Sequence, residues 1–498
     1  MQISILIAVF FVLFAAGVVQ DTSVGPTVWT GDWGPAESAG LRSLGLLVGS
    51  TMLFWSIIRL TARILLRRMQ PLGWENRSAM RLPGRIDLFV QTMLLLLFAA
   101  QITIGGWTRV VLCDWDLGNT ILIWEVVLIL PFIILMVIKW ICYYPINRFI
   151  RMHVVVEQLT DNISTRPVWK LGHYLSFQLR HGLLIILIPL LMIFAFRDTV
   201  EWASYRFWHE RMSAMQIEGI TLAGVGVIFL LAPLLLRFIW STRSLPAGPL
   251  RDRLTEFCKQ LNMRYQDILL WETHNAVANA AVMGLLWPVR YVLLSDALIE
   301  NMDDEQIEAV FGHEAGHVKH HHILFLVLFV FATGSVILGT MEFFARFTLS
   351  HDFLHSYQDT IVLTSGVLLG LGWIALFGWV SRRYERQADV HAAISIERIQ
   401  SVGEMDTEKC RAGKTLGEKG AAVVGSALER IAILNGISIH SRSWRHSSIA
   451  SRVAFVKRLA QEPRALKRFN RTVTLIKLIT IGVLLVTVST AYMCTRIE

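Results

Sequence analysis

Residues 303–340 decide the fold, and they read DDEQIEAVFGHEAGHVKHHHILFLVLFVFATGSVILGT. The acidic residues at 303–305 are typical of the first turn of a helix, because the helix dipole favours negative charge there. The part beyond His322 is an apolar run of the length that a helix needs to cross a bilayer. The stretch therefore predicts a polar helix that leads into a membrane span.

The polar helix contains the pattern His-Glu-x-x-His at residues 313–317. Residues four apart lie one turn above each other on one face of a helix, so His313 and His317 can both present imidazole nitrogens to one Zn²⁺ at about 2.0–2.1 Å. Glu314 is placed to hold the zinc-activated water and to take its proton. The structural alternative is a charged helix surface near the membrane.

The composition places the chain in a bilayer. Of its 498 residues, 54% are hydrophobic and 17% are charged, whereas soluble chains carry about 25% charged residues. The net charge of +9 fits the arginine and lysine that gather in cytoplasmic loops, so we expect no nucleic-acid partner. The 5 cysteines are scattered and lack Cys-x-x-Cys spacing, which indicates neither a disulfide framework nor a cysteine zinc site.

Apolar stretches of about the length that crosses a bilayer recur along the chain. They lie at about 3–20, 43–62, 87–105, 120–142, 181–196, 218–240, 323–346, 360–380 and 472–493. The first could be a cleaved signal peptide, because Phe14–Gly17 offers small residues, but it lacks the basic start of such peptides. We therefore expect a retained span.

The connections between these stretches alternate in charge. Cations crowd the connections after the second and fourth stretches, whereas those at 21–40, 106–119 and 347–359 hold acidic residues instead. The positive-inside rule assigns the basic connections to the cytoplasm. We therefore expect a multi-pass integral membrane protein, located in the cell membrane or, in a eukaryote, in the endoplasmic reticulum.

Two segments, 241–320 and 381–471, are too polar for the membrane and lie on the basic side. Two spans separate them, and an even number of crossings returns the chain to the same face, so the segments can form one domain. Within the second segment, 401–421 is expected to be a polar loop. We predict an N-terminal membrane domain of about six spans at 1–240 and a C-terminal span at 472–498. Between them, residues 241–471 form a cytoplasm-facing domain that carries the zinc motif and is interrupted by two spans, at about 323–346 and 360–380.

The third metal ligand must come from elsewhere, since a catalytic zinc site takes three protein ligands and keeps its fourth position open. The metzincin pattern needs Gly and His where this chain has His320 and Ile323. The other solution is a glutamate on a later helix, and the segment SRRYERQAD at 381–389 supplies it. We therefore predict one Zn²⁺ per chain, held by His313, His317 and Glu385.

Other polar residues near the motif receive plainer interpretations. Asp389, one turn after Glu385, faces the same way and can hold the second nitrogen of a ligand histidine. His320, His321 and His322 follow the motif at the membrane boundary. Because three adjacent residues cannot all face one metal, we expect them to be interfacial residues.

Together these motifs resemble the integral-membrane zinc metallopeptidases that include HtpX and the type 1 CAAX prenyl protease. HEAGH is followed by two spans and then by a match to the family's S-R-x-x-E-x-x-A-D pattern, and before it NAAVMG at 279–284 is similar to N-A-x-x-x-G. Residues 446–453 resemble H-P-[ST]-x-x-x-R-[IV], with Ser447 in the place of proline. The resemblance covers roughly 250–460, and the first 240 residues match no family.

The resemblance implies a mainly α, multi-span membrane protein whose helical gluzincin-type catalytic domain has a small β-sheet. Asn279 and Ala280 would belong to an edge strand that pairs with extended substrate backbone. The apolar run 291–294 is compatible with a neighbouring strand. His446 would hydrogen-bond the developing oxyanion, with Arg452 as an internal ion-pair partner. An exposed basic loop is the alternative for 442–458.

The expected function is hydrolysis of peptide bonds by zinc-activated water, with Glu314 as the base. A cleft at the cytoplasmic surface suits membrane-associated or lipid-modified polypeptides, whether prenylated or subject to general quality control. The rival is a metal-binding membrane transporter or receptor without proteolytic activity, whose pathway residues would be Asp87, Glu125 and Glu342. A pseudoenzyme scaffold is disfavoured because Glu314 is present.

Overall fold

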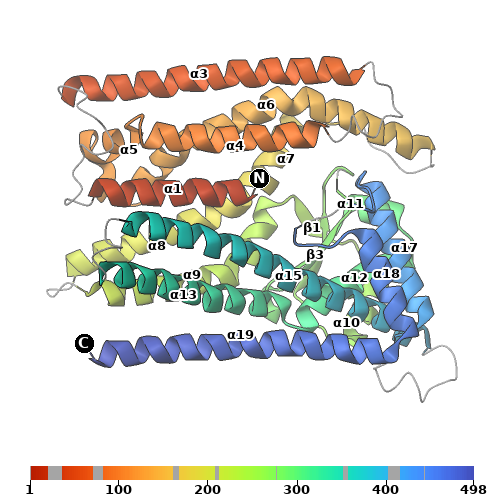
Figure 1. Cartoon of the computed structure of the whole chain (residues 1–498). Coiled ribbons are helices and arrows are strands. Elements are labelled where there is room, and N and C mark those ends of the chain that lie inside the picture. The colour runs from red at the N-terminus through yellow and green to blue at the C-terminus, as the bar shows by residue number, and fades with distance from the viewer. Residues whose placement is uncertain are drawn as a thin grey trace. The chain divides into compact units, whose positions relative to one another are not determined.

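A computed structural model of the chain describes residues 2–20, 36–70, 82–160, 168–207, 212–275, 277–350, 357–401, 416–441 and 444–497. These residues form two compact units, Met1–Trp240 and Ser241–Glu498 (Figure 1). Helices dominate both units, and one four-stranded sheet lies in the second. The prediction of a mainly helical membrane protein with a small sheet is confirmed.

The first unit consists of helices alone within its described residues. They are α1 (Gln2–Gln20), α3 (Ala36–Met69), α4 (Leu82–Ile102), α5 (Trp107–Arg109), η3 (Val110–Asp114), η4 (Leu117–Asn119), α6 (Ile123–Thr160), α7 (Leu171–Gln178), η5 (Leu179–Leu184), α8 (Ile185–Phe207) and α9 (Ala214–Ile239). Four helical stretches here are long and apolar enough to cross a membrane: Gly40–Met69, Ile123–Met152, Leu171–Phe207 and Gln216–Ile239.

Two of the expected spans differ in extent from the helices of this unit. The short stretch expected at 181–196 is part of a 37-residue helical run, Leu171–Phe207, which contains the π-helical turn η5. The stretch expected at 87–105 ends where the helix bends by 50° before it continues to Asp114. Gly106 lies at this bend with a φ of +69°, a conformation that glycine adopts without strain.

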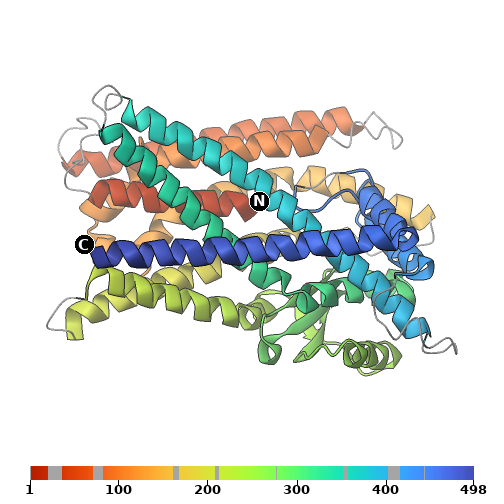
Figure 2. The same cartoon turned by 60° about the horizontal axis from the view of Figure 1, so that its bottom comes forward.

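The second unit carries the expected polar segments and the last three spans. Its elements are β1 (Thr242–Ser244), α10 (Pro249–Gln260), β2 (Asp267–Trp271), β3 (Ala280–Met283), η6 (Trp287–Val289), β4 (Tyr291–Ser295), α11 (Asp296–Asn301), α12 (Asp304–Lys319), α13 (His322–Leu349), α15 (Gln358–Ser401), α17 (Glu418–Leu434), α18 (Ile449–Gln461) and α19 (Pro463–Ile497). The long helices α13, α15 and α19 pack side by side, and the sheet and the shorter helices gather at one end of them (Figures 1 and 2).

The sheet has the strand order β1-β2-β4-β3, so β3 is an edge strand. β4 is buried along its whole length and pairs in parallel with β2 and antiparallel with β3. The free edge of β3 is turned towards the zinc motif, since β3 packs against α12. The sheet thereby supplies a wall beside the helix that carries His313 and His317.

Three local features depart from the sequence expectations. α12 and α13 are two helices rather than one, because His321 adopts a left-handed conformation between them (φ +53°). The eighth apolar stretch continues without a break as α15 to Ser401. The polar loop expected at 401–421 ends earlier, since Glu418 already begins α17, and its residues 402–415 lie outside the described part of the chain.

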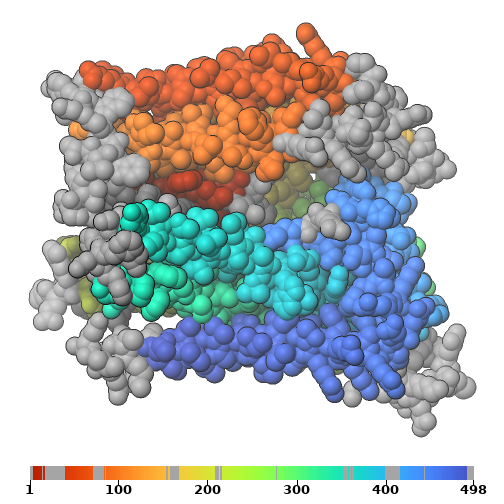
Figure 3. All heavy atoms as spheres, in the orientation of Figure 1, coloured from red at the N-terminus to blue at the C-terminus, as the bar shows by residue number. Residues whose placement is uncertain are grey.

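The exposed faces of the three long helices carry many apolar side chains, as a lipid environment requires. Atoms of α15 and α19 form part of the surface seen in Figure 3. Exposed side chains include Val330, Phe331, Leu338 and Phe343 on α13, Leu368, Leu371, Ile374 and Leu376 on α15, and Leu475, Leu478, Ile479 and Leu485 on α19. The inner faces meet in a core of Phe329, Val380, Tyr384, Val473 and Ile476. This bundle anchors α15 next to α12.

Candidate metal centre

Small residues hold α12 and α15 unusually close together. A Cβ on Gly316 would lie 3.0 Å from the Cα of Ala388, and one on Gly312 would lie 3.2 Å from the Cα of Ala392. These contacts are four residues apart on both antiparallel helices, so they mark one continuous seam. His313 and His317 follow the two glycines directly, and Glu385 lies within a turn of Ala388. The seam therefore brings the three side chains to one place.

The donor atoms of these three residues form a compact triangle. The Nε2 atoms of His313 and His317 are 3.3 Å apart. Each Nε2 lies 3.7 Å from an oxygen of the Glu385 carboxylate. The three donor atoms thus all lie within 4.8 Å of one another.

This arrangement fits a zinc ion. Ligands held at about 2.0–2.1 Å in a tetrahedral array lie roughly 3.3–3.4 Å apart, which is close to the separations in the cluster. Two imidazoles and one carboxylate are also a donor set that zinc enzymes use. Burial, together with the positive charge of nearby His313, lowers the pKa of His317 to about 4. His317 is therefore neutral at physiological pH, as metal binding requires.

The first ligand histidine, His313, is held by Asp389, which also forms an ion pair with Arg452. Asp389 Oδ1 lies 2.9 Å from His313 Nδ1, so this nitrogen donates and Nε2 is left to face the metal. Arg452 donates to both oxygens of the same carboxylate, from Nε at 2.9 Å and from Nη2 at 2.5 Å. Asp389 and Arg452 are both buried. The structure thus brings together the residues predicted to support the site.

The second ligand histidine is fixed by a residue that the sequence analysis did not assign to the site. His322 Nδ1 lies 3.0 Å from His317 Nδ1, and His322 Nε2 lies 2.9 Å from Gln387 Oε1. Because Gln387 Oε1 only accepts, His322 donates through Nε2 and accepts from His317 through Nδ1, which leaves His317 Nε2 for the metal.

His322 begins the candidate span His322–Thr348, at the expected boundary, but it also supports the site. Its side chain is fully buried and stacks on Tyr384, with ring centroids 4.7 Å apart. The left-handed residue His321 turns it inward. In the sequence, the only sign of this role is that His322 lies close to the motif. The two neighbouring histidines made that sign ambiguous. His320 and His321 remain at the helix junction, and His320 stacks on His322.

Glu314 lies beside the cluster and the sheet edge. Its Oε2 accepts a hydrogen bond from the backbone N–H of Val282, on β3, at 3.2 Å. Desolvation by the surrounding protein raises the pKa of Glu314 to about 7, although the positive charge of His313 acts in the opposite direction. A carboxylate with a pKa near neutrality can both accept and return a proton.

The remaining predicted site residues lie around this centre. His446 Nδ1 is 2.9 Å from Glu385 Oε2, and its side chain is 47% exposed. Ala280 begins the edge strand β3. Asn279 precedes the strand, and its backbone N–H and C=O contact Ser295 on the side of β4. The side chain of Asn279 is exposed.

The carboxylates proposed for a transport pathway lie in both units, Asp87 and Glu125 in the first and Glu342 in the second. Asp87 pairs with Lys139 at 2.8 Å in the first unit. Glu342 pairs with Arg346, one turn along α13, at 2.7 Å. Glu125 is buried on α6 with one carboxylate oxygen that lacks a hydrogen-bond partner among the described residues. Only the His/Glu cluster gathers metal-ligand side chains in the part of the chain that the structure describes.

Comparison with known proteins agrees with this geometry. Residues 244–404 match peptidase family M48. A protease HtpX homolog of Leptothrix cholodnii is 30% identical over 149 residues, which are 28% of this chain and 50% of that protein. A CAAX prenyl protease 1 homolog of Arabidopsis thaliana is 28% identical over 177 residues, which are 33% of this chain and 39% of that protein. The chain thus spans half or less of the length of these relatives.

The crystal structure of S. mikatae Ste24p aligns with a TM-score of 0.49 and 15% sequence identity, over 83% of this chain and 98% of that one. The family match covers both helices of the seam, α12 and α15, up to residue 404. Residues 244–404 thus match peptidase family M48, and the chain is an integral membrane protein that is similar to proteases of the HtpX and CAAX prenyl protease kind.

Proposed function

We propose that this chain is an integral-membrane zinc metalloendopeptidase that hydrolyses peptide bonds of membrane-associated polypeptides. One observation carries the proposal: His313, His317 and Glu385 converge within 4.8 Å, with the carboxylate of Glu314 beside them at the edge of a sheet. A bound zinc ion would supply Lewis acidity towards a water molecule and towards the scissile carbonyl.

Glu314 and His446 would carry out the proton transfers and the contact with the oxyanion. Glu314 takes a proton from the attacking water at a carboxylate oxygen and delivers it to the nitrogen of the leaving amine. Its pKa of about 7 suits both transfers. His446 donates from Nδ1 to Glu385, so it can also donate to an oxyanion only when Nε2 carries a proton. His446 is our candidate for the oxyanion donor.

The edge strand provides a template for an extended substrate. The backbone of residue 279 faces β4, and because successive residues of a strand alternate in direction, residues 280 and 282 face outwards. The backbone N–H and C=O of residue 280 and the C=O of residue 282 can pair with a substrate strand, whereas the N–H of Val282 already donates to Glu314. Pairing of this kind recognises backbone shape more than side chains.

The surroundings of the site favour substrates at the membrane. α12 is followed after two residues by the candidate span His322–Thr348, and Glu385 lies on the helix that forms the next candidate span. We place the site at the cytoplasmic surface, as the basic loops predict. Relatives named CAAX prenyl proteases make prenylated polypeptides one class of substrate, and membrane proteins in general are the other.

The decisive experiment compares the wild-type protein with Glu314→Gln in lipid vesicles that contain a defined peptide library. We expect the variant to retain zinc, measured by elemental analysis, because none of the three ligands changes. Cleavage, measured as new peptide termini by mass spectrometry, should fall by about 10²–10⁴-fold, since a general base contributes that much.

The matched control is Glu305→Gln, an exposed acid at the start of the same helix. It should leave both zinc content and cleavage unchanged. A chelator should abolish cleavage by the wild type, and added zinc should restore it. Zinc binding without any cleavage by the wild type would favour the transporter or receptor reading, and undiminished cleavage by Glu314→Gln would remove Glu314 from the mechanism.

A further inference from the structure

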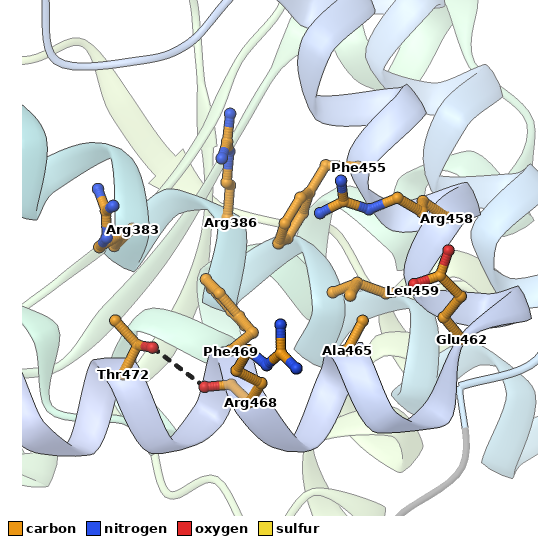
Figure 4. Close-up of a pocket in the computed structure, with 10 residues that line it drawn as sticks. All are labelled: Arg383, Arg386, Phe455, Arg458, Leu459, Glu462, Ala465, Arg468, Phe469 and Thr472. Atoms are coloured by element: carbon orange, nitrogen blue, oxygen red, sulfur yellow. Dashed lines mark hydrogen bonds between the residues drawn. The ribbon is translucent and has the colours of Figure 1, made fainter.

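A cavity whose lining includes none of the metal-centre residues lies between α15, α18 and α19 (Figure 4). Its volume is about 360 Å³. Glu462 is its one acidic lining residue, and the arginines among its lining residues are Arg383, Arg386, Arg458 and Arg468. Four guanidinium groups against one carboxylate give the cavity a strong positive charge.

Two of these guanidinium groups have neutral hydrogen-bond partners in the part of the chain that the structure describes. Within the described residues, none of the four forms an ion pair with an acid; the neutral partners are a carbonyl oxygen for Arg383 and the Ser451 hydroxyl for Arg386, at 3.2 and 3.3 Å. The Nε of Arg386 is buried without a hydrogen-bond partner. This buried atom is closed to the cavity, so the donors that can reach an anion there are the exposed guanidinium groups of Arg458 and Arg468.

An aromatic ring holds two of the arginines in place. The guanidinium groups of Arg386 and Arg458 lie 4.7 and 5.6 Å from the centroid of Phe455, and Phe469 packs edge-on against that ring. Figure 4 shows the guanidinium of Arg458 turned towards Phe455. Stacking on a ring leaves the N–H edges of a guanidinium available, and this fork matches the oxygens of a phosphate.

The cavity lies where two membrane helices leave the apolar region. On α15 the exposed apolar run ends at Trp379, and Arg383 stacks on this ring one turn later, at 3.4 Å. On α19 the exposed apolar run begins at Leu475, two turns after Arg468. Tryptophan marks the level of the lipid headgroups, so the arginines lie at the level of the phosphates.

We propose that this cavity binds the phosphate group of an anionic phospholipid. A soluble phosphorylated molecule shares the phosphate chemistry. The lipid is favoured because both α15 and α19 continue from the cavity into lipid-facing surface, along which acyl chains can lie. Basic pockets between membrane helices at this level are suited to anionic headgroups.

The test titrates phosphatidylglycerol into the full-length protein in neutral detergent and follows the first bound lipid by native mass spectrometry. Arg458→Gln/Arg468→Gln should raise the apparent Kd about thirtyfold, because each cation near an anionic headgroup contributes roughly 1 kcal/mol. Lys457→Gln/Arg471→Gln removes the same charge from exposed positions of the same helices outside the cavity. It should leave the Kd within about threefold.

Two further measurements distinguish a lipid phosphate from a soluble one. Phosphatidylcholine should bind no more weakly to the double variant than to the wild type, and inorganic phosphate alone should not compete with phosphatidylglycerol. If inorganic phosphate binds with the same dependence on Arg458 and Arg468, the lipid assignment is overturned. Equal Kd values for phosphatidylglycerol in the cavity variant and its control would also overturn it. Should the double variant lose its thermal transition, Arg468→Gln alone, which is exposed, should still raise the Kd about fivefold.

Discussion

At the scale of single residues, the centre depends on side chains that never touch the metal. Asp389 joins His313 to Arg452, and His322 joins His317 to Gln387. In both cases the hydrogen bond engages Nδ1 of the ligand histidine, so its Nε2 is left to face the metal. Such supporting partners are typically worth 10–100-fold in metal affinity.

The substitution Asp389→Asn tests the first connection. It keeps the size of the side chain, but it leaves the buried guanidinium of Arg452 without its counter-charge. We expect zinc affinity to fall by about 10–100-fold and the free energy of unfolding to fall by about 3–5 kcal/mol, as when one partner of a buried ion pair is removed. Competition with a zinc-binding dye and thermal melting measure the two effects; unchanged zinc affinity would contradict the support role of Asp389.

The substitution His322→Phe tests the second connection. Phenylalanine can still stack on Tyr384, but it cannot accept from His317 or donate to Gln387. We expect a loss of zinc affinity of about 10–100-fold with the fold intact, measured by the same competition. His440→Phe, at an exposed position outside the centre, is the matched control. Equal affinities in the two variants would show that His322 only fills space.

The ligands could be predicted from the sequence, whereas the role of His322 could not. The pairing of His313 with His317, and of Glu385 with Asp389, follows from spacing along regular helices, which periodicity encodes. His322 does not: on an unbroken helix it would point roughly 140° away from His317. The helix breaks at His321, whose left-handed conformation no local pattern announces, and the break returns the side chain to the site.

At the scale of elements, the seam between α12 and α15 sets the distance between ligands. The motif predicted a helix that starts at 303–305 and a later helix around Glu385, but not how closely they approach. That depends on which residues lie opposite Gly312 and Gly316, and the alanines there are far away in sequence. The pairing of β2 with β4 was likewise not predictable, since parallel neighbours depend on a crossover rather than on a local turn.

The substitution Gly316→Val tests the seam. The added Cβ would lie 3.0 Å from the Cα of Ala388 and 3.1 Å from the Cβ of His391, so the helices must separate. We expect a loss of about 1–3 kcal/mol in the free energy of unfolding, as for other overpacked contacts, and a weaker hold on zinc because Glu385 moves with α15. Thermal melting and zinc content measure these changes.

Gly334→Val provides the control for the seam. A Cβ at Gly334 meets nothing within 4 Å, although the residue lies in a helix of the same unit. We expect a change within about 0.5 kcal/mol and full zinc content. If both valines destabilise the protein equally, the general response of a helix to valine, and not the seam, explains the effect.

At the scale of the whole molecule, the centre exists because a helical hairpin returns the chain to one side of the membrane. α13 has 28 residues, which as a helix extend about 42 Å, more than the hydrocarbon core of a bilayer. Ser350, at the far end of α13, should therefore lie on the opposite side from α10 and α17. The metal ligands on α12 and α15 can meet only if the segments before and after the hairpin share one side.

Cysteine labelling of a variant without the native cysteines tests this arrangement and its orientation. Lys259→Cys on α10, Lys419→Cys on α17 and Ser350→Cys all place a thiol at an exposed position. In intact cells a membrane-impermeant maleimide should label only Ser350→Cys, because we place the centre on the cytoplasmic side, and lysis should expose the other two. If intact cells label Lys259→Cys and Lys419→Cys but not Ser350→Cys, the orientation is the reverse of the one we propose, and the hairpin arrangement still holds. Labelling of Lys259→Cys and Lys419→Cys from different sides would separate the two halves of the centre, and no metal could then be shared between α12 and α15.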